Sequence, residues 1–359
     1  MKKFILVLLV LALALSATAC NNDSTGNGDN GDFDTNAPYM INYSEEMKDV
    51  SLNVYSVSDI THVLDAFTED TGITANVLQM TNGEILQRVQ HEKDSGQVLA
   101  DIWYRGGADA FVDAASKGYF SSYKSHELEN FADYTKDEEG YWSGTTMTLV
   151  GWVVNTAILE ELDIDLPTKW DDLLNPKLKD MVSMPNPAIS GTAYNTVSGI
   201  LQVRGHELGW EYFDQLIEQV PFFTPRGSDP TNLVMAGEAA IGIIATFGER
   251  DMRNNENPVI KLIYPEDGTG WWPQPLAILD GAPNGDAAKV FVDWVLSERG
   301  MTRIIEMDSV LGLRQGIESP EELLRLDNVN LFPTDFEQNA LQRDEILEIW
   351  TQKVTAAGK

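Results

Sequence analysis

The chain has 359 residues, of which 43% are hydrophobic, and this length and composition are typical of a globular protein of about two domains. It carries 56 Asp and Glu against 25 Lys and Arg, and the resulting net charge of −31 disfavours nucleic acid and anionic lipid as partners. The chain contains one cysteine, which excludes an internal disulfide framework, so the body must be held together by its hydrophobic core.

The N-terminus has the pattern of a secretion signal. Two lysines precede an apolar run from Phe4 to Leu15, which is too short to span a bilayer, and small residues then lead to Cys20. Cys20 resembles the acylated cysteine of bacterial lipoproteins. We therefore expect a signal peptide over residues 1–19 and an exported protein that a lipid on Cys20 holds at the cell membrane, facing the exterior or the periplasm. The alternative is ordinary cleavage beside a free thiol.

Residues 20–46 are predicted to form the lipidated cysteine and a disordered tether. The stretch from Asn21 to Pro38 is rich in Asn, Asp, Gly, Ser and Thr and has almost no apolar side chain to bury. It contains a G-x-G-x-x-G match at positions 26, 28 and 31, but no strand precedes the match and no amphipathic helix follows it, so no dinucleotide site is predicted. We expect neither a cofactor nor a resident metal.

The body begins with alternating strands and helices. Hydrophobic periodicity predicts a strand followed by a helix three times in succession, at 51–56 and 59–70, 74–78 and 83–92, and 100–104 and 109–116. This alternation predicts an α/β fold with a largely parallel sheet. Residues 47–149 are assigned to the first part of one lobe.

The pattern restarts after a strongly β-forming segment at 145–155. The predicted elements that follow are helices at 170–174, 192–203 and 210–219 and strands at 181–184 and 239–246. The restart predicts a second lobe over residues 150–264, with hinges near Val150 and Tyr264, after which the chain returns to the first lobe through Gly268–Trp272. Residues 265–359 complete that lobe and add C-terminal helices, predicted near 287–296, 320–326 and 335–352.

Several segments resemble, in the same order, the type II solute-binding proteins that feed ABC importers. The segments are Ala-Asp-Ile-Trp-Tyr-Arg-Gly-Gly and the residues after it at 100–119, Trp-Asp-Asp-Leu-Leu-Asn-Pro at 170–176, Ser-Gly-Thr-Ala-Tyr at 190–194, and the runs at 237–242 and 287–294. They are most similar to a branch that includes ferric-ion, phosphonate and sugar-phosphate binders. The resemblance implies two α/β lobes joined by two hinge strands, a small-molecule ligand in the cleft between them, and no enzymatic activity. It also implies ABC permease and ATPase subunits as partners, and we expect a monomer.

One loop is the first candidate for holding an anionic ligand. Ser190, Gly191 and Thr192 lie between a predicted strand and a predicted helix, so their hydroxyl and amide groups would point at whatever lies beyond the helix N-terminus. A plain helix cap uses the same residue types. The family resemblance places this loop on the cleft and favours ligand contact.

Two further loops carry arginines, which could bind a carboxylate or phosphate in a chain short of cations. Arg226 and Ser228 follow an apolar pair and precede a predicted helix, and their alternative is a solvated surface turn. Arg105 precedes Gly106 and Gly107, a pair that permits close approach of the backbone to a ligand or forms a simple turn.

The ends of predicted strands supply the remaining candidates, because open α/β sheets bind ligands at the carboxyl ends of their strands. Ser56 and Ser58 end the first strand, and Thr246 ends a strand of the second lobe. Trp271 lies at the return crossing and could stack on a ligand, although packing of the hinge is the more common role of such a residue.

The residue types favour an oxyanion as the ligand. Ferric binders of this branch use two adjacent tyrosines, and the sequence contains no Tyr-Tyr pair, so iron is disfavoured. Ser, Thr and Arg at loops and at a helix N-terminus suit an organic phosphate, a phosphonate or a carboxylate. The branch also holds cation binders, and an acidic cleft that uses Glu249 or Asp229 could serve ferric ion or a polyamine.

Two other classes of protein were weighed. A surface-anchored hydrolase finds little support, because there is no G-x-S-x-G elbow, and His91, His126 and His206 each lack the second histidine that a zinc site at i, i+4 requires. A ligand-sensing lipoprotein partnered with a signalling receptor uses the same fold, and the sequence does not separate sensing from transport.

Overall fold

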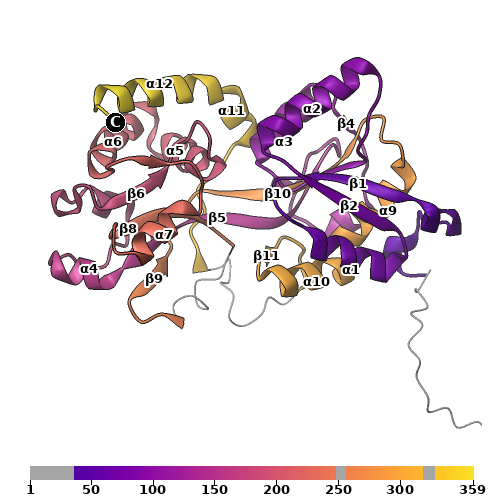
Figure 1. The fold of residues 1–359 in the computed structure, drawn as a ribbon, viewed down its shortest axis with the longest axis horizontal. Coiled ribbons are helices and arrows are strands. Elements are labelled where there is room, and N and C mark those ends of the chain that lie inside the picture. The colour runs from indigo at the N-terminus through magenta and orange to yellow at the C-terminus, as the bar shows by residue number, and fades with distance from the viewer. Residues whose placement is uncertain (1–35, 248–255, 318–327) are drawn as a thin grey trace, which may run out of the picture. The chain divides into compact units, whose positions relative to one another are not determined.

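The computed structural model describes residues 36–247, 256–317 and 328–359, and these form one mixed sheet with helices on both faces (Figure 1). Cys20, the signal peptide, Glu249 and the predicted helix at 320–326 lie outside the described residues. The strands are β1 (Ser51–Ser56), β2 (Thr74–Gln79), β3 (Ile102–Tyr104), β4 (Phe120–Ser121), β5 (Ser143–Asn155), β6 (Val182–Pro185), β7 (Phe223–Thr224), β8 (Ile241–Thr246), β9 (Ile260–Ile263), β10 (Trp271–Leu279) and β11 (Leu311–Gly312). Their order in the sheet is β2-β1-β3-β10-β5-β8-β6-β7, with β11 and β9 on β5 and β4 on β10.

The helices separate the strands in the order expected of an α/β fold. The α-helices are α1 (Thr61–Thr71), α2 (Asn82–Ser95), α3 (Ala108–Ser116), α4 (Thr156–Glu161), α5 (Gly191–Arg204), α6 (His206–Gln219), α7 (Asp229–Met235), α9 (Gly285–Leu296), α10 (Glu298–Asp308), α11 (Phe336–Leu341) and α12 (Arg343–Ala356). Short 3-10 helices are η1 (Pro38–Met40), η2 (Glu45–Asp49), η3 (His126–Asn130), η4 (Asp133–Thr135), η5 (Trp170–Leu174) and η6 (Pro176–Leu178).

The first group of elements surrounds the parallel strands β2, β1 and β3. Helices α1, α9 and α10 lie on one side of this part of the sheet and α2 and α3 on the other (Figure 1). Phe67 of α1 packs edge-on against Phe291 of α9 with ring centroids 5.0 Å apart, and Trp103 of β3 contacts Phe111 of α3 at 4.4 Å. Each face of this sheet half therefore has its own apolar core.

The second group surrounds β8, β6 and β7, which also run parallel to one another. Its core includes Trp152 of β5, which meets Trp170 of η5 edge-on with ring centroids 5.1 Å apart. The C-terminal helix α12 packs on the same core, because Ile346 and Trp350 are buried there beside residues of α6. Helix α12 thus packs with the second group, whereas α11 packs against α3 of the first group.

Strands β5 and β10 connect the two groups. β5 pairs antiparallel with β10 up to Leu149 and antiparallel with β8 from Leu149 onward, so one strand belongs to both halves of the sheet. All 13 of its residues are buried, which explains its run of Thr, Val and Trp side chains. The amide of Val150 donates to Gly270 with a distance of 2.8 Å, so the two connecting segments are bonded to each other where the chain passes between groups.

The structure differs from the sequence-based expectations in three respects. The sheet is mixed rather than largely parallel, because the chain crosses between the groups in opposite directions along β5 and β10. The predicted helix at 335–352 is two helices, α11 and α12, separated at Gln342. Residues 36–46, predicted to be tether, include η1 with Tyr39 and Met40 buried in the first core, so the body begins earlier than residue 47.

A buried carboxylate joins α1 to α9 and α10. Asp70 accepts hydrogen bonds from the indole of Trp294 at 2.9 Å, from Arg299 at 2.8 and 3.0 Å and from Arg303 at 2.9 Å. Burial by itself raises the pKa of Asp70, but the hydrogen bonds from Arg299 and Trp294 and the charge of Arg303 outweigh it, so the pKa of Asp70 lies below its ordinary value.

Because the folded pKa of Asp70 lies below the unfolded pKa, this residue stabilises the fold above about pH 4 and loses that contribution as the pH falls through the folded value. We expect Asp70→Asn to lower the free energy of unfolding by about 1–2 kcal/mol at pH 7 and by less at pH 3. Urea unfolding at both pH values checks this. The control is Asp286→Asn, which removes an exposed ion pair with Lys289 and should not change the free energy of unfolding measurably. An equal loss for Asp70→Asn at both pH values would contradict a lowered pKa of Asp70 in the folded protein.

Candidate functional site

The carboxyl ends of the two parallel strand groups carry the sequence-predicted residues. In the first group, Ser56 ends β1 and Arg105 follows β3, its neighbour in the sheet. In the second group, Ser190 to Thr192 lie where the chain passes from β6 to α5, Arg226 and Ser228 follow β7, and Thr246 ends β8; Trp271 begins β10. This is the edge at which open α/β sheets place ligands, so the topology gathers the candidates at two edges, one in each group.

The loop after β6 and the loop after β7 touch each other. A Cβ atom on Gly227 would lie 2.3 Å from the hydroxyl of Thr192 and 3.6 Å from that of Ser190, so only glycine allows the two loops to pack this closely. Sequence reasoning named the two loops separately, and the structure brings Ser190, Gly191 and Thr192 together with the segment from Arg226 to Ser228.

The N-terminus of α5 is only partly capped. The Ser190 hydroxyl accepts from the amide of Ala193 over a long 3.5 Å, and the first-turn amides of Gly191 and Thr192 have no intrahelical acceptor. The hydroxyl of Thr192 makes no hydrogen bond within the described part of the chain, although the residue is only 6% exposed. Two amides and a hydroxyl at a helix N-terminus are the groups that bind an oxyanion.

Arg226 and Ser228 are exposed beside this helix terminus. The amide of Arg226 donates to the carboxylate of Asp229 at 2.9 Å, so this carboxylate already has a hydrogen-bond partner within the loop. The guanidinium of Arg226 contacts no acidic side chain among the residues that the structure describes. The charge of the Arg226 guanidinium is therefore available to an anion, whereas the carboxylate of Asp229 is hydrogen-bonded to the loop backbone.

Arg105, in contrast, has an internal partner. Its guanidinium forms an ion pair with Asp308 of α10 and lies over the ring of Tyr104 at 5.1 Å, and Asp308 also contacts His62 at 2.6 Å. The side chain of Arg105 is only 12% exposed, and its Nε is buried without a partner in the described regions. Its charge is balanced by Asp308, which accepts from one Nη group, so a ligand contact from Arg105 would use other N–H groups of the guanidinium.

The glycine pair after Arg105 lies against polar side chains that the sequence did not single out. The amide of Gly106 donates to Gln274 of β10 and that of Gly107 donates to Asn82 of α2, each at 3.3 Å. A Cβ on Gly106 would lie 2.6 Å from the Asn82 amide oxygen, so this glycine is required for close approach to Asn82. Gln274 also donates to Thr148 of β5 at 2.6 Å.

The serines after β1 are enclosed. Ser56 is fully buried, and its hydroxyl accepts from the amide of Ser58 at 3.2 Å. The hydroxyl of Ser58 is buried and has no hydrogen-bond partner among residues 36–247, 256–317 and 328–359. A buried hydroxyl without a partner is uncommon, which keeps Ser58 among the candidates for ligand contact.

Thr246 and Trp271 lie where the chain passes between the groups. The hydroxyl of Thr246 bonds the carbonyl of Leu149 at 3.2 Å and the hydroxyl of Tyr264 at 2.8 Å. The indole of Trp271 donates to the carbonyl of Phe332 at 2.9 Å, and its ring is 5% exposed. Both side chains make their polar contacts within the protein, so stacking of Trp271 on a ligand would require the ring to move.

An arginine joins the first turns of α5 and α3. The guanidinium of Arg343 lies 4.3 Å from the ring centre of Tyr194 in α5 and bonds Asp109 in α3 at 2.5 Å. Burial raises the pKa of Tyr194 above its ordinary value of 10.0, so its hydroxyl stays protonated and donates to the carbonyl of Asn339. Arg343 and Asp109 are 234 positions apart, which is why local sequence patterns do not reveal the pair.

None of the described helices is both long enough and apolar enough to cross a membrane. Across the same residues, no three side chains of His, Cys, Asp or Glu gather in an arrangement that could hold a metal ion.

Known proteins resemble this chain over most of its length. The family model described as bacterial extracellular solute-binding protein matches residues 98–309. An uncharacterized protein of Haemophilus influenzae is 31% identical over 301 residues, which cover 81% of this chain and 86% of that protein. A putative 2-aminoethylphosphonate-binding periplasmic protein of Salmonella typhimurium is 25% identical, with 72% of this chain and 75% of that protein covered.

A solved structure shares the fold. The periplasmic binding protein AfuA from Actinobacillus pleuropneumoniae, determined with exogenous fructose-6-phosphate bound, superposes with a TM-score of 0.76 at 25% identity and covers 85% of this chain and 98% of its own. Two strand groups that share crossing strands, with polar loops at their carboxyl ends, are thus the two lobes of a known binding architecture. The chain belongs to the bacterial extracellular solute-binding proteins, which are two-lobe α/β binding proteins of ABC importers and not enzymes.

Proposed function

We propose that the protein captures a small anionic solute, an organic phosphate, a phosphonate or a carboxylate, and delivers it to a membrane permease. The observation that carries this proposal is the contact between Thr192 and Gly227, which brings a helix N-terminus and the Arg226 loop together. The first-turn amides, the hydroxyls and the Arg226 guanidinium, which has no acidic partner among the described residues, offer donors and positive charge. The nearby carboxylate of Asp229 is bonded to the Arg226 amide, and this combination favours oxyanions.

The chemistry named for relatives agrees with this donor set. The Salmonella typhimurium relative is named for 2-aminoethylphosphonate, and the AfuA structure holds fructose-6-phosphate. Both molecules carry a tetrahedral phosphorus group with anionic oxygens. The net charge of −31 does not oppose such a ligand, because short-range hydrogen bonds at the helix terminus act locally whereas distant surface charge is screened by salt.

Capture would use both lobes. In this proposal the anionic group lies at Ser190, Gly191, Thr192, Arg226 and Ser228, and the rest of the solute contacts residues at the carboxyl ends of β1 and β3. Rotation about β5 and β10 would close the lobes, and the closed state would be the one that the permease recognises. Ser58 and the other N–H groups of the Arg105 guanidinium would contact the solute from the first lobe.

We further propose that a lipid on Cys20 anchors the protein to the cell membrane after removal of residues 1–19. An importer needs an ATPase as well as a permease, and we assign both as partners of a monomeric binding protein. Transport and ligand sensing share the same capture step, so this part of the proposal rests on the sequence of the N-terminus and on the family.

Thermal unfolding with a panel of solutes tests the ligand class. Fructose-6-phosphate and 2-aminoethylphosphonate should raise the stability, by about 2.7 kcal/mol at a concentration 100 times the dissociation constant. Fructose, which lacks the phosphorus group, is the matched control for fructose-6-phosphate and should have no effect. Stabilisation by ferric citrate or spermidine alone would contradict an anionic ligand and favour the cation-binding alternative.

A further inference from the structure

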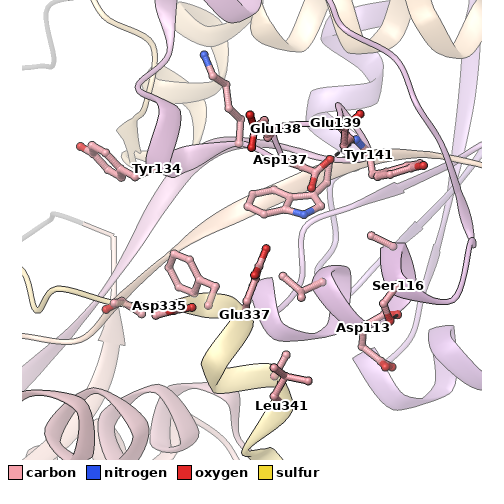
Figure 2. A pocket seen from close by; sticks show the side chains of 17 residues that line it. Asp113, Ser116, Tyr134, Asp137, Glu138, Glu139, Tyr141, Asp335, Glu337 and Leu341 are labelled. Carbon is pink, nitrogen blue, oxygen red and sulfur yellow. Dashed lines mark hydrogen bonds between the residues drawn. The ribbon is translucent and has the colours of Figure 1, made fainter.

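A cavity of about 870 Å³ (Figure 2) adjoins one of the residues proposed for solute contact, Trp271, whose ring meets Tyr134 and Phe336 of the cavity wall edge-on. Its walls are α3, the segment from Tyr134 to Trp142 that leads into β5, and α11 with the residues just before it. None of the twelve residues proposed for solute contact lines it. Its volume lies within the range of sites that bind small organic molecules.

The walls of this cavity are strongly acidic. They carry six carboxylates, from Asp113, Asp137, Glu138, Glu139, Asp335 and Glu337. The cationic side chain in the lining is Lys136, whose ammonium group donates to the carbonyls of Leu128 and Phe131 at 2.8 and 2.9 Å and pairs with Asp133. Its charge is therefore directed at neighbouring backbone rather than at the wall carboxylates.

Three of the carboxylates are unengaged. Asp113 pairs with Lys117, Asp137 accepts from the amide of Tyr141, and Asp335 accepts from the amide of Gln338. The carboxylates of Glu138, Glu139 and Glu337 have no hydrogen-bond or ion-pair partner within the described ranges. Glu337 on α11 lies across the cavity from Asp137 and Glu138 (Figure 2). Free carboxylates on opposite walls attract a cation placed between them.

Aromatic rings complete the lining. Tyr134, Tyr141, Trp142 and Phe336 all contribute to the walls. Aromatic faces attract organic cations, most strongly when the cation is partly removed from water. Carboxylates together with rings therefore select a cation that also has an apolar surface, such as an alkylammonium group, over a fully hydrated metal ion.

Trp142 provides a further, independent indication of a ligand. The residue is 7% exposed, so it is more than nine-tenths buried, yet its indole N–H has no hydrogen-bond acceptor in the described part of the protein. An indole N–H in a largely buried residue usually has a partner, and this N–H is not among the fully enclosed side-chain atoms, so it is open to a molecule in the cavity. A ligand that carries a hydroxyl or carbonyl oxygen beside its cationic group would supply that acceptor.

We infer that this cavity is a second ligand site, which binds a small organic cation that carries an oxygen acceptor. The free carboxylates bind the cationic group, the rings pack against its alkyl groups, and the indole of Trp142 donates to its oxygen. The site shares no residue with the proposed solute site, and Trp271 is the residue of that set whose ring contacts its wall.

Calorimetric titration with choline tests the charge requirement. The full exported chain should bind choline saturably with one site, and 3,3-dimethyl-1-butanol, the neutral analogue of the same shape, should bind at least tenfold more weakly. The double variant Glu138→Gln, Glu337→Gln should lose at least tenfold in choline affinity. A matched double variant of exposed α4 residues, Glu160→Gln, Glu161→Gln, removes the same charge and should bind choline as the unaltered chain does.

The oxygen acceptor is tested by Trp142→Phe, which keeps an aromatic ring and removes the N–H group. This variant should weaken choline several-fold and leave tetramethylammonium, which has no oxygen, unchanged. Equal losses for both probes would overturn the role given to the indole.

The two sites are separated by crossing the variants with the ligands. Thr192→Ala should leave choline binding unchanged, and Glu138→Gln, Glu337→Gln should leave binding of fructose-6-phosphate unchanged. Loss of choline binding in Thr192→Ala would place the cation in the solute site and overturn the inference. Absence of saturable choline binding, or equal binding of the neutral analogue, would also overturn it, whatever the result with phosphorylated solutes.

Discussion

Replacing Ser190 and Thr192 together by alanine should weaken the binding of a phosphorylated solute about 100-fold. Each hydroxyl is placed to donate one hydrogen bond to an anionic oxygen, and a bond to a charged group contributes about 1.5–3 kcal/mol. Two such bonds at the lower end of this range amount to about 3 kcal/mol, or roughly two orders of magnitude in the dissociation constant. Titration calorimetry with the phosphorylated solute that gives the largest thermal shift measures the change.

The control lies in the same helix. Ser198 of α5 is buried, and its hydroxyl has no partner within the described residues, so Ser198→Ala makes the same chemical change two turns from the helix N-terminus. We expect this variant to bind like the unaltered chain. The double variant also loses the Ser190 cap, which costs about 1 kcal/mol of stability, so unfolding curves must confirm that it is folded at the titration temperature. Unchanged affinity in a folded double variant would exclude the α5 terminus as the anion site.

Trp350→Ala should lower the free energy of unfolding by about 3–5 kcal/mol, because it removes a large side chain from a closed core. The ring is 1% exposed and meets Phe213 and Phe223 edge-on, with centroids 5.7 and 5.2 Å away. These contacts attach α12 to the second lobe, and α12 begins at Arg343, which bonds Asp109 of the first lobe. Urea unfolding followed by tryptophan fluorescence measures the loss.

Two companion variants test the reason for this loss. Trp350→Phe keeps most of the packing and removes an indole N–H that is buried without an acceptor in the described residues, so its cost should be well below that of alanine. Leu208→Ala truncates a leucine that is 61% exposed on α6, and its effect should stay within about 0.5 kcal/mol. A small effect of Trp350→Ala would mean that α12 contributes little to the folded state.

Local sequence patterns predicted most of the first lobe correctly. The predicted strands at 51–56, 74–78 and 100–104 correspond to β1, β2 and β3, and the helices between them are α1 and α2. Here the signals are local: Thr81 and Glu84 form the capping box of α2, and Gly72 ends α1 with a positive φ of 74°. Such signals depend on residues a few positions apart, and a sequence displays them directly.

Elements whose stability depends on distant partners were missed. The two-residue strands β4, β7 and β11 are too short for a periodic pattern. They form by pairing with stretches of β10, β6 and β5, respectively, that are distant in the sequence. The direction of β10 relative to β5 also follows from the path of the whole chain, so the antiparallel centre of the sheet was not expected. The break between α11 and α12 at Gln342 carries neither Gly nor Pro to mark it.

Local patterns in the sequence were enough to predict an α/β chain with polar loops after its strands, the family to which it belongs and, through residues 1–20, export and a lipid anchor. Which of the candidate charges are free could be seen only once the chain is folded. Arg105 and Arg226 look alike in the sequence, yet Arg105 is paired with Asp308 and Arg226 has no acidic partner among the described residues. Ion pairing depends on distances of a few ångströms between residues as much as 203 positions apart, and such distances are set by the packing of the fold.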